Sequence, residues 1–283
     1  MAISLESIVS GRENKPPLVI MHGVGGIGKT TFAAGDPDLG IAGPPSPIFL
    51  MTVVGLGRLK PHRFAPVPGD PVIRSWAELI ECVAFLYNEQ HDHKTVVIDT
   101  IDGVERLIWA HLCSQYGQPK IDTNDKGSPF AFGRGYLYAV DEAGVLLRWL
   151  EALRNDRGMT AILLAHTETA KVDPPDSESY TEWSIGVHKR LTSRLYDWCD
   201  VCLFGQWKTH VVKDDDSRDP KKKRARGVGT GERVMYTERR PAWLAKNRYG
   251  LPPEMPLSWA ALQEAIGSFG EAPNSTSVSP ATA

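Results

Sequence analysis

The sequence predicts an α/β fold with a mostly parallel central sheet, helices on both of its faces and a β-hairpin extension towards the carboxyl end. Three observations lead to this prediction. Short apolar runs alternate with longer amphipathic segments, a glycine-rich turn joins the first such pair, and two extended segments flank a charged run at residues 213–231. With 283 residues, the chain is long enough to bury a sizeable core.

Each predicted element rests on its local pattern. Short continuous apolar runs predict strands at residues 18–22, 47–54, 95–99, 159–166 and 198–204. Apolar residues that recur every three or four positions predict helices at residues 75–90, 102–116, 136–154 and 185–198. Ser75 is the expected N-cap of the helix that follows it, because a serine hydroxyl accepts a hydrogen bond from a free amide of the first turn.

Two segments interrupt this regular order. Residues 167–183 are polar, contain Pro174 and Pro175 and show no periodicity, so we expect a long loop there. Residues 208–233 are expected to form an extended basic hairpin. A single domain is therefore predicted over residues 1–266, followed by a Ser/Thr/Pro/Ala-rich disordered tail at 267–283.

The composition excludes several classes of protein. A formal net charge of -2 excludes nucleic-acid binding through overall charge, so any such contact needs a local basic surface. No apolar run reaches the ~20 residues that cross a bilayer, and the first residues lack a secretion signal, which predicts a cytoplasmic protein without membrane contact. Cys199 and Cys202 have no second pair for zinc and are expected to be core thiols.

A phosphate-binding motif follows the first predicted strand. Residues 23–30 fit the pattern G-x-x-x-x-G-K-[ST] at every fixed position. Glycines let the backbone amides approach an anion, Lys29 supplies a charge for the β- and γ-phosphates, and Thr30 supplies a hydroxyl for Mg²⁺. We therefore predict a Mg²⁺–ATP site formed by Gly23, Val24, Gly25, Gly26, Ile27, Gly28, Lys29, Thr30 and Thr31.

A second carboxylate is needed to orient the metal ion. Asp99 ends the apolar strand Val96–Ile98 and is the candidate, so Thr30 and Asp99 are the predicted metal-binding residues. Asp102 follows in the next turn, and we expect it to cap the helix that begins there.

The order of motifs resembles that of a known family. The phosphate loop is followed by Val96–Thr100, by the strand Ala161–His166, by Trp198–Val201 and by Ala245–Gly250. This order resembles the phage RecA-like P-loop ATPases of the Sak-type single-strand annealing group, from about Leu18 to Ile266. The resemblance implies a RecA-like fold.

The resemblance also implies roles for single residues. His166 would sense the γ-phosphate, and the loop after it would contact DNA, with Lys171, Tyr180 and Trp183 as the contacts; a solvated lid is the alternative. Lys246 and Arg248 would reach the γ-phosphate of a neighbouring subunit, as in ring-forming relatives. Their other interpretation is a pair of surface cations.

One feature departs from the family pattern. RecA-like ATPases carry a catalytic glutamate just after the second strand, whereas residues 49–57 contain no acid. Either Asp102 or Glu105 replaces this glutamate, or hydrolysis is slow and ATP acts mainly as a switch.

Two further segments are candidates for DNA binding. The densest basic run contributes Lys221, Lys222, Lys223, Arg224 and Arg226, which would give salt-dependent binding to phosphates, unless the run is a solvated hairpin tip. Residues 127–136 mix aromatic residues with glycines, and we interpret them as a connector rather than as a stacking loop for bases.

Together these observations predict an ATPase that binds single-stranded DNA and promotes annealing or homologous recombination as a homo-oligomer, in a ring or a filament, with a single-strand-binding protein as a further candidate partner. Three alternatives remain: a ring-type DNA motor or helicase loader, a weakly hydrolysing nucleotide switch, and a small-molecule kinase.

Overall fold

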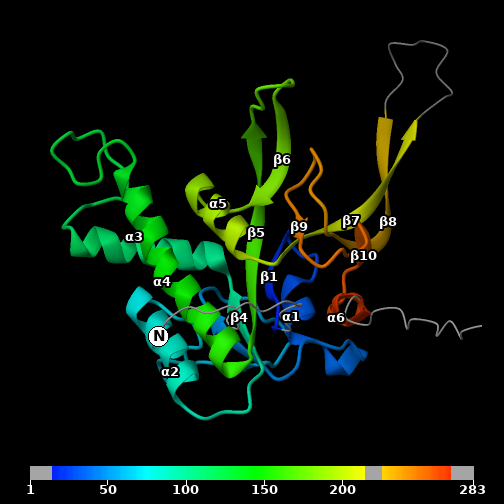
Figure 1. Ribbon diagram of the computed structural model, residues 1–283, viewed down its shortest axis with the longest axis horizontal. Coiled ribbons are helices and arrows are strands. Elements are labelled where there is room, and N and C mark those ends of the chain that lie inside the picture. Colours follow the sequence, from blue (N-terminus) through cyan, green and yellow to red (C-terminus); the bar gives the residue numbers. More distant parts are fainter. Residues whose placement is uncertain (1–14, 214–224, 269–283) are drawn as a thin grey trace, which may run out of the picture.

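A mixed β-sheet forms the centre of the molecule (Figure 1). The computed structural model describes residues 15–213 and 225–268. Within these residues the strand order is β10-β8-β7-β1-β5-β4-β2-β3; β6 pairs with β5, and β9 pairs with β7. The strands are β1 (Leu18–Gly23), β2 (Pro47–Met51), β3 (His62–Arg63), β4 (Thr95–Asp99), β5 (Thr160–Val172), β6 (Tyr180–Ile185), β7 (Val201–Lys213), β8 (Ala225–Tyr236), β9 (Lys246–Asn247) and β10 (Glu254–Pro256).

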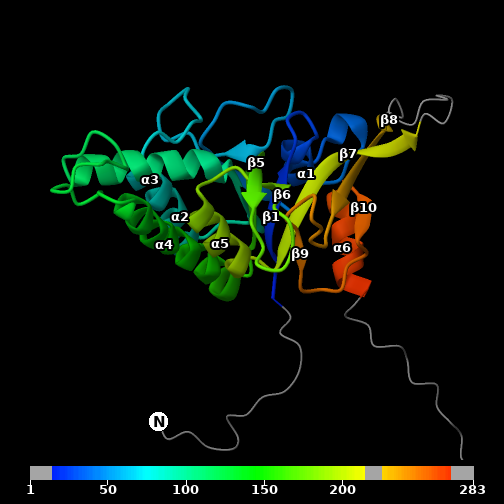
Figure 2. The same cartoon turned by 90° about the horizontal axis from the view of Figure 1, so that it is seen from above.

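The six strands from β7 to β3 in this order run parallel to one another. Strand β8 is antiparallel to both of its neighbours, β7 and β10. The helices are α1 (Lys29–Ala34), α2 (Trp76–Asn88), α3 (Ile101–Gln115), α4 (Arg134–Arg157), α5 (Lys189–Trp198) and α6 (Trp259–Ser268), with the short 3₁₀ helix η2 (Pro37–Leu39). Figure 2 shows α2, α3, α4 and α5 on one face of the sheet and α1 and α6 on the other. The predicted fold class is confirmed.

The two faces of the sheet bury separate apolar clusters. In β4, Val96 and Ile98 belong to the cluster under α2–α5, whereas Val97 packs with Phe32 of α1 and Trp259 of α6. Successive side chains of a strand point to opposite faces, so a strand covered on both sides must be apolar at every position. This is why the continuous apolar runs of the sequence identified the strands.

Several local predictions hold to within a few residues. The strand at 95–99 has the predicted bounds, and the strand predicted at 47–54 ends earlier, at Met51. Ser75 caps α2, because its side chain accepts a hydrogen bond from the Glu78 amide at 3.2 Å. The antiparallel pairing of β7 with β8 agrees with the predicted hairpin extension, and residues 214–224 lie outside the described residues.

The loop predicted at 167–183 was wrong. The chain there forms a hairpin, in which the outer half of β5 pairs antiparallel with β6 from Thr167↔Ile185 to Val172↔Tyr180. Threonine, valine and aromatic residues suit a strand, and Pro174 and Pro175 lie in the turn between them. The helix predicted from Ile185 therefore begins only at Lys189.

The predicted cap of α3 was also wrong. Thr100, rather than Asp102, is the N-cap of this helix, and its hydroxyl accepts a hydrogen bond from the Gly103 amide at 3.3 Å. This frees the Asp102 carboxylate for another contact, described below.

The remaining predictions concern the cysteines and the connector. Cys199 and Cys202 are buried free thiols, as predicted, and the part of the chain that is described holds no group of three His, Cys, Asp or Glu residues placed to bind a metal ion. In the connector, Phe130 is buried, whereas Phe132 is 76% exposed.

No helix within residues 15–213 or 225–268 is long and apolar enough to cross a membrane. The predicted tail lies outside the described residues from residue 269 onwards.

Candidate nucleotide-binding site

The phosphate loop connects the end of β1 to the start of α1. Gly26 and Gly28 have φ angles of 74° and 108°, which L side chains rarely adopt, so glycine is needed at both positions of this turn. Gly23 is needed for a different reason, because a Cβ there would lie 2.4 Å from the carbonyl oxygen of Gly205 in β7. The predicted glycines thus have separate structural tasks.

Lys29 folds back over the loop. Its Nζ donates hydrogen bonds to the carbonyl oxygens of Gly23 at 2.9 Å and Val24 at 3.3 Å. Burial lowers the pKa of Lys29 below its usual range, although the carboxylates of Asp99 and Asp102 oppose that shift. A partly desolvated ammonium held by neutral carbonyls is well placed to exchange them for phosphate oxygens.

Thr30 and Asp99 meet on the floor of the site. The Thr30 hydroxyl donates to Oδ2 of Asp99 at 3.0 Å, although the two residues are 69 positions apart. Burial raises the pKa of Asp99 above its ordinary range, and the hydrogen bond from Thr30 and the charge of Lys29 partly offset the shift. A buried carboxylate beside a hydroxyl is the oxygen donor pair that suits Mg²⁺.

A pocket of about 460 Å³ opens above these residues. Its lining combines the phosphate loop, the segment after β2, the end of β4 and the histidine of β5: Gly25, Gly26, Gly28, Lys29, Thr30, Thr31, Val53, Val54, Gly55, Leu56, Arg58, Leu59, Asp99, Thr100 and His166. The pocket lies at the carboxyl ends of parallel strands, where ligands bind in open α/β sheets.

His166 stands beside the phosphate loop because β5 pairs with β1 in the register Gly23↔His166. Its backbone amide donates to Oδ1 of Asp102 at 3.1 Å, and its Nδ1 lies 3.0 Å from Oδ2 of the same carboxylate. Burial would raise the pKa of Asp102, but the hydrogen bonds from His166 and Thr100 lower it below its ordinary value. Asp102 is therefore an ionised partner of His166.

Glu105, the other candidate for the missing glutamate, points elsewhere. Its carboxylate accepts hydrogen bonds from the His188 amide at 3.0 and 3.2 Å, and it does not line the pocket. Burial raises the pKa of Glu105 to about 7.

Lys246 and Arg248 do not line the pocket. The Arg248 guanidinium binds the side chain of Asp200 at 3.2 Å and the carbonyl of Asp197 at 3.1 Å, and Lys246 donates to the carbonyls of Tyr196 and Asp197. Asp200 precedes β7, whose first residue pairs with Val19 near the start of β1. These cations therefore lie at the amino end of the parallel strands, opposite the phosphate loop.

The basic run predicted to contact DNA lies outside the described residues at Lys221, Lys222, Lys223 and Arg224. Arg226 is in β8, where its backbone pairs with β7, but its side chain is not described.

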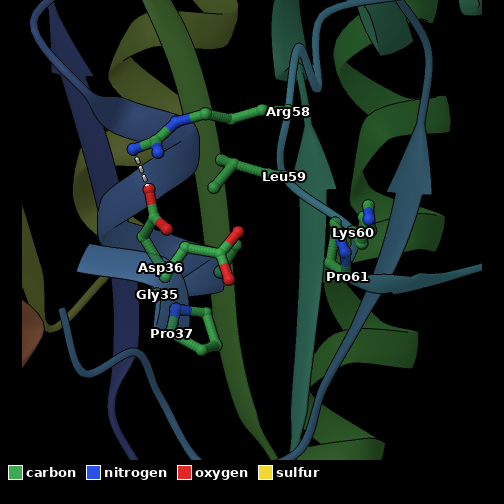
Figure 3. Close-up of a pocket in the computed structure, with 9 residues that line it drawn as sticks. Gly35, Asp36, Pro37, Arg58, Leu59, Lys60 and Pro61 are labelled. Carbon is green, nitrogen blue, oxygen red and sulfur yellow. Dashed lines mark hydrogen bonds and ion pairs between the residues drawn. The ribbon is translucent and has the colours of Figure 1, made fainter. Parts of the chain in front are cut away.

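The sequence missed two cations beside the pocket. The guanidinium of Arg233 in β8 lies over the Trp207 ring, 4.9 Å from its centroid. The same side chain approaches the phosphate loop, because a Cβ added to Gly28 would lie 3.1 Å from Nη1 of Arg233. Arg58 lines the pocket and forms an ion pair with the buried Asp36, beside a second cavity of about 230 Å³ (Figure 3). Neither residue belongs to a motif, since strand pairing and loop packing bring each of them there.

His22 was also missed. It is fully buried beneath the loop, where its Nε2 lies 2.8 Å from the Leu244 carbonyl and its Nδ1 lies 3.2 Å from the Thr167 hydroxyl. Burial lowers its pKa to about 4, so the ring is neutral. Its contact with Thr167 connects β1 to the start of the β5–β6 hairpin.

The fold and this arrangement of Lys29, Thr30 and Asp99 define a P-loop nucleoside triphosphatase domain. A family model described as an AAA domain (AAA_24) matches residues 15–249, so the chain belongs to this family of P-loop ATPase domains. Its members generally use ATP with Mg²⁺. No curated protein matches the chain.

Proposed function

We propose that this protein hydrolyses ATP, that it binds single-stranded DNA, and that it promotes annealing or homologous recombination as a homo-oligomer. The ATPase part follows from the family and from one observation, the meeting of Thr30 and Asp99 at 3.0 Å beneath a pocket lined by Lys29 and the positive-φ glycines. The DNA part is supported by the resemblance in motif order and by the basic run at residues 221–226 of the sequence.

The residues present fit magnesium and a triphosphate. Thr30 and Asp99 offer hard oxygen donors, and bound Mg²⁺ would neutralise charge on the β- and γ-phosphates. Lys29 would leave the carbonyls of Gly23 and Val24 to bind the same phosphates, and the loop amides would surround them. The chain thus orients the γ-phosphate for attack by water.

ATP turnover measured with and without single-stranded DNA tests this proposal. Stimulation by DNA would support it, whereas indifference would favour a nucleotide switch or a kinase. Replacing Lys221, Lys222, Lys223 and Arg224 with glutamine should weaken DNA binding and reduce its salt dependence, because fewer counterions are released. An unchanged salt slope would make that run a solvated tip, and strand displacement by the wild type would indicate a motor instead.

The oligomer part depends on Lys246 and Arg248. They face away from their own pocket, and the Arg248 side chain is 53% exposed, which suits contact with the phosphates of a neighbouring subunit. A mixing experiment separates this role from a structural one. Arg248→Ala has a complete pocket but lacks the guanidinium that would reach a neighbouring subunit, whereas Lys29→Ala keeps this guanidinium but has no working pocket. We expect ATP turnover to recover when the two variants are mixed; no recovery would contradict a role in trans.

One observation favours a second candidate function, a weakly hydrolysing switch. The pocket-lining segment 53–59 provides no carboxylate to polarise the attacking water. Tight ATP binding with turnover no higher than that of Lys29→Ala, with or without DNA, would establish this candidate in place of the ATPase.

A further inference from the structure

The candidate site contains a buried acid that does not itself line the pocket. Asp102 has a side chain that is 6% exposed, and it accepts hydrogen bonds from both the backbone amide and the ring of His166. The His166 side chain is 56% exposed and lines the pocket. Two contacts from one carboxylate therefore fix both the position and the rotation of this ring at the pocket wall.

This arrangement also determines which ring nitrogen carries the proton. An ionised carboxylate accepts hydrogen bonds but cannot donate one, so Nδ1 of a neutral His166 must hold its proton towards Asp102. Nε2 is then left with a lone pair. A histidine held in this tautomer by an aspartate can accept a proton from water or from a hydroxyl.

The same place in the site needs such a group. The segment after β2 lines the pocket without an acid, and Glu105 is occupied by the His188 amide. His166 lies beside Gly23 through the β1–β5 pairing and shares the pocket with Lys29 and Asp99. It is thus the basic side chain next to the predicted γ-phosphate position that can accept a proton.

We propose that His166 positions and deprotonates the attacking water and that Asp102 is its positioning residue, so that this pair replaces the glutamate missing after β2. The proposal rests on the proposed ATPase function. In this step the water oxygen forms a bond to the γ-phosphorus, and the bond from that phosphorus to the β–γ bridging oxygen breaks. The electron pair leaves with ADP, the water proton passes to Nε2 and then to solvent, and inorganic phosphate is released.

Asp102→Asn tests the pair most directly. The amide keeps the size of the carboxylate but donates a hydrogen bond to Nδ1, which moves the ring proton to Nε2 and removes the acceptor from the pocket. We expect kcat to fall about 100-fold or more, in line with the loss of a general base, while the Kd for a non-hydrolysable ATP analogue stays within about twofold. The ¹⁵N chemical shifts of His166 should report the change of tautomer.

Arg106→Gln is the matched control. Arg106 also contacts Asp102, at 3.5 Å, but its side chain is 59% exposed and it makes no contact with His166 among those described. Its removal should leave kcat within about threefold, because exposed ion pairs contribute little. His166→Ala should lower kcat as much as Asp102→Asn, and the double variant should lose no more than either single one, since the two residues act as a unit.

Each outcome decides between interpretations. If kcat of Asp102→Asn or of His166→Ala stays within about threefold of wild type, the proposal is overturned. If instead the variants lose their preference for the ATP analogue over ADP, His166 is a γ-phosphate sensor and the proposal is also overturned. His166→Ala keeps the test valid if Asp102→Asn fails to fold, because that ring is largely exposed. Wild-type turnover no higher than that of Lys29→Ala would contradict the ATPase function itself.

Discussion

The two ends of the parallel strands each hold a buried aspartate, and the two differ in their partners. Asp200, at the amino end, forms ion pairs with the guanidinium groups of Arg154 at 3.0 Å and Arg248 at 3.2 Å, and it accepts a hydrogen bond from the Leu18 amide at 3.1 Å. Asp99, at the carboxyl end, accepts one from the Thr30 hydroxyl at 3.0 Å. Both side chains are buried.

The difference separates an acid that is neutralised within the fold from one that is not. Two guanidinium groups neutralise Asp200, so its burial is compensated within the chain. Burial instead raises the pKa of Asp99, because a hydroxyl and the nearby Lys29 offset its desolvation only in part. A carboxylate that is only partly compensated in this way gains most from a bound cation, which agrees with the metal-binding role predicted for Asp99. The same contrast leads to four predictions.

The largest effect is expected from Asp200→Ala. The substitution leaves Arg154 and Arg248 without their shared carboxylate, so the free energy of unfolding should fall by about 3–5 kcal/mol. Urea denaturation would measure it. Asp197→Ala is the control, because this neighbouring side chain is exposed and should change stability by less than about 0.5 kcal/mol. Equal losses in the two variants would contradict the structural role of Asp200.

Lys29→Ala should act on binding rather than on folding. Loss of the ammonium should weaken ATP binding by at least about 100-fold, or about 3 kcal/mol, since hydrogen bonds to charged groups contribute strongly. Isothermal titration calorimetry with Mg²⁺ and ATP would measure this. The exposed Lys120→Ala should bind normally. Normal ATP binding by Lys29→Ala would remove the nucleotide site from residues 23–30.

Glu105 is a third buried acid to compare with Asp200 and Asp99, and its hydrogen-bond partner is a neutral backbone amide. Its pKa is raised to about 7, so the folded state holds a proton that the unfolded chain releases near pH 4.5. Its contribution to stability is therefore greatest at low pH and declines as the pH rises from about 4.5 to about 7. Glu105→Gln should remove this decline and raise stability at pH 8 by roughly 1–2 kcal/mol.

Thermal unfolding of wild type and Glu105→Gln at pH 5 and pH 8 would check this. The two proteins should differ little at pH 5, where Glu105 is mostly protonated when folded. A parallel pH dependence of the two proteins would show that Glu105 is not responsible.

The smallest change in stability is expected from Asp99→Asn. The neutral amide removes the desolvation of a buried charge, so the metal-free protein should be as stable as wild type or more stable, by up to about 1 kcal/mol. ATP turnover should nevertheless be lost, because the carboxylate predicted to hold Mg²⁺ is gone. Differential scanning calorimetry with a turnover assay would measure both. A large loss of stability would make Asp99 a structural acid like Asp200.

Local patterns predicted the parts of this protein that depend on neighbouring residues. The strand before the phosphate loop, the glycines of the turn and the helix from Lys29 lie within 17 residues of sequence, from Leu18 to Ala34. The position of Asp99 at the pocket could be predicted because it ends a fully apolar strand. The hairpin of β5 and β6 was missed, since its strands are polar and the pairing partner cannot be read from either one.

Contacts between distant elements were beyond local patterns. Asp102 was expected to cap α3, but it binds His166, which is 64 positions away and belongs to β5. Arg233 reaches Gly28 because β8 pairs with β7, and β7 lies beside β1. Neither residue carries a signal in the sequence around it.

The sequence by itself determined the chemistry of the phosphate loop, because a glycine turn, a lysine and a threonine act within a few consecutive residues. Tertiary structure decided which acids lie at the pocket and which are neutralised by cations elsewhere in the fold. The reason is physical: whether a buried carboxylate is neutralised depends on the charges packed against it, and those come from strands and helices far apart in the chain.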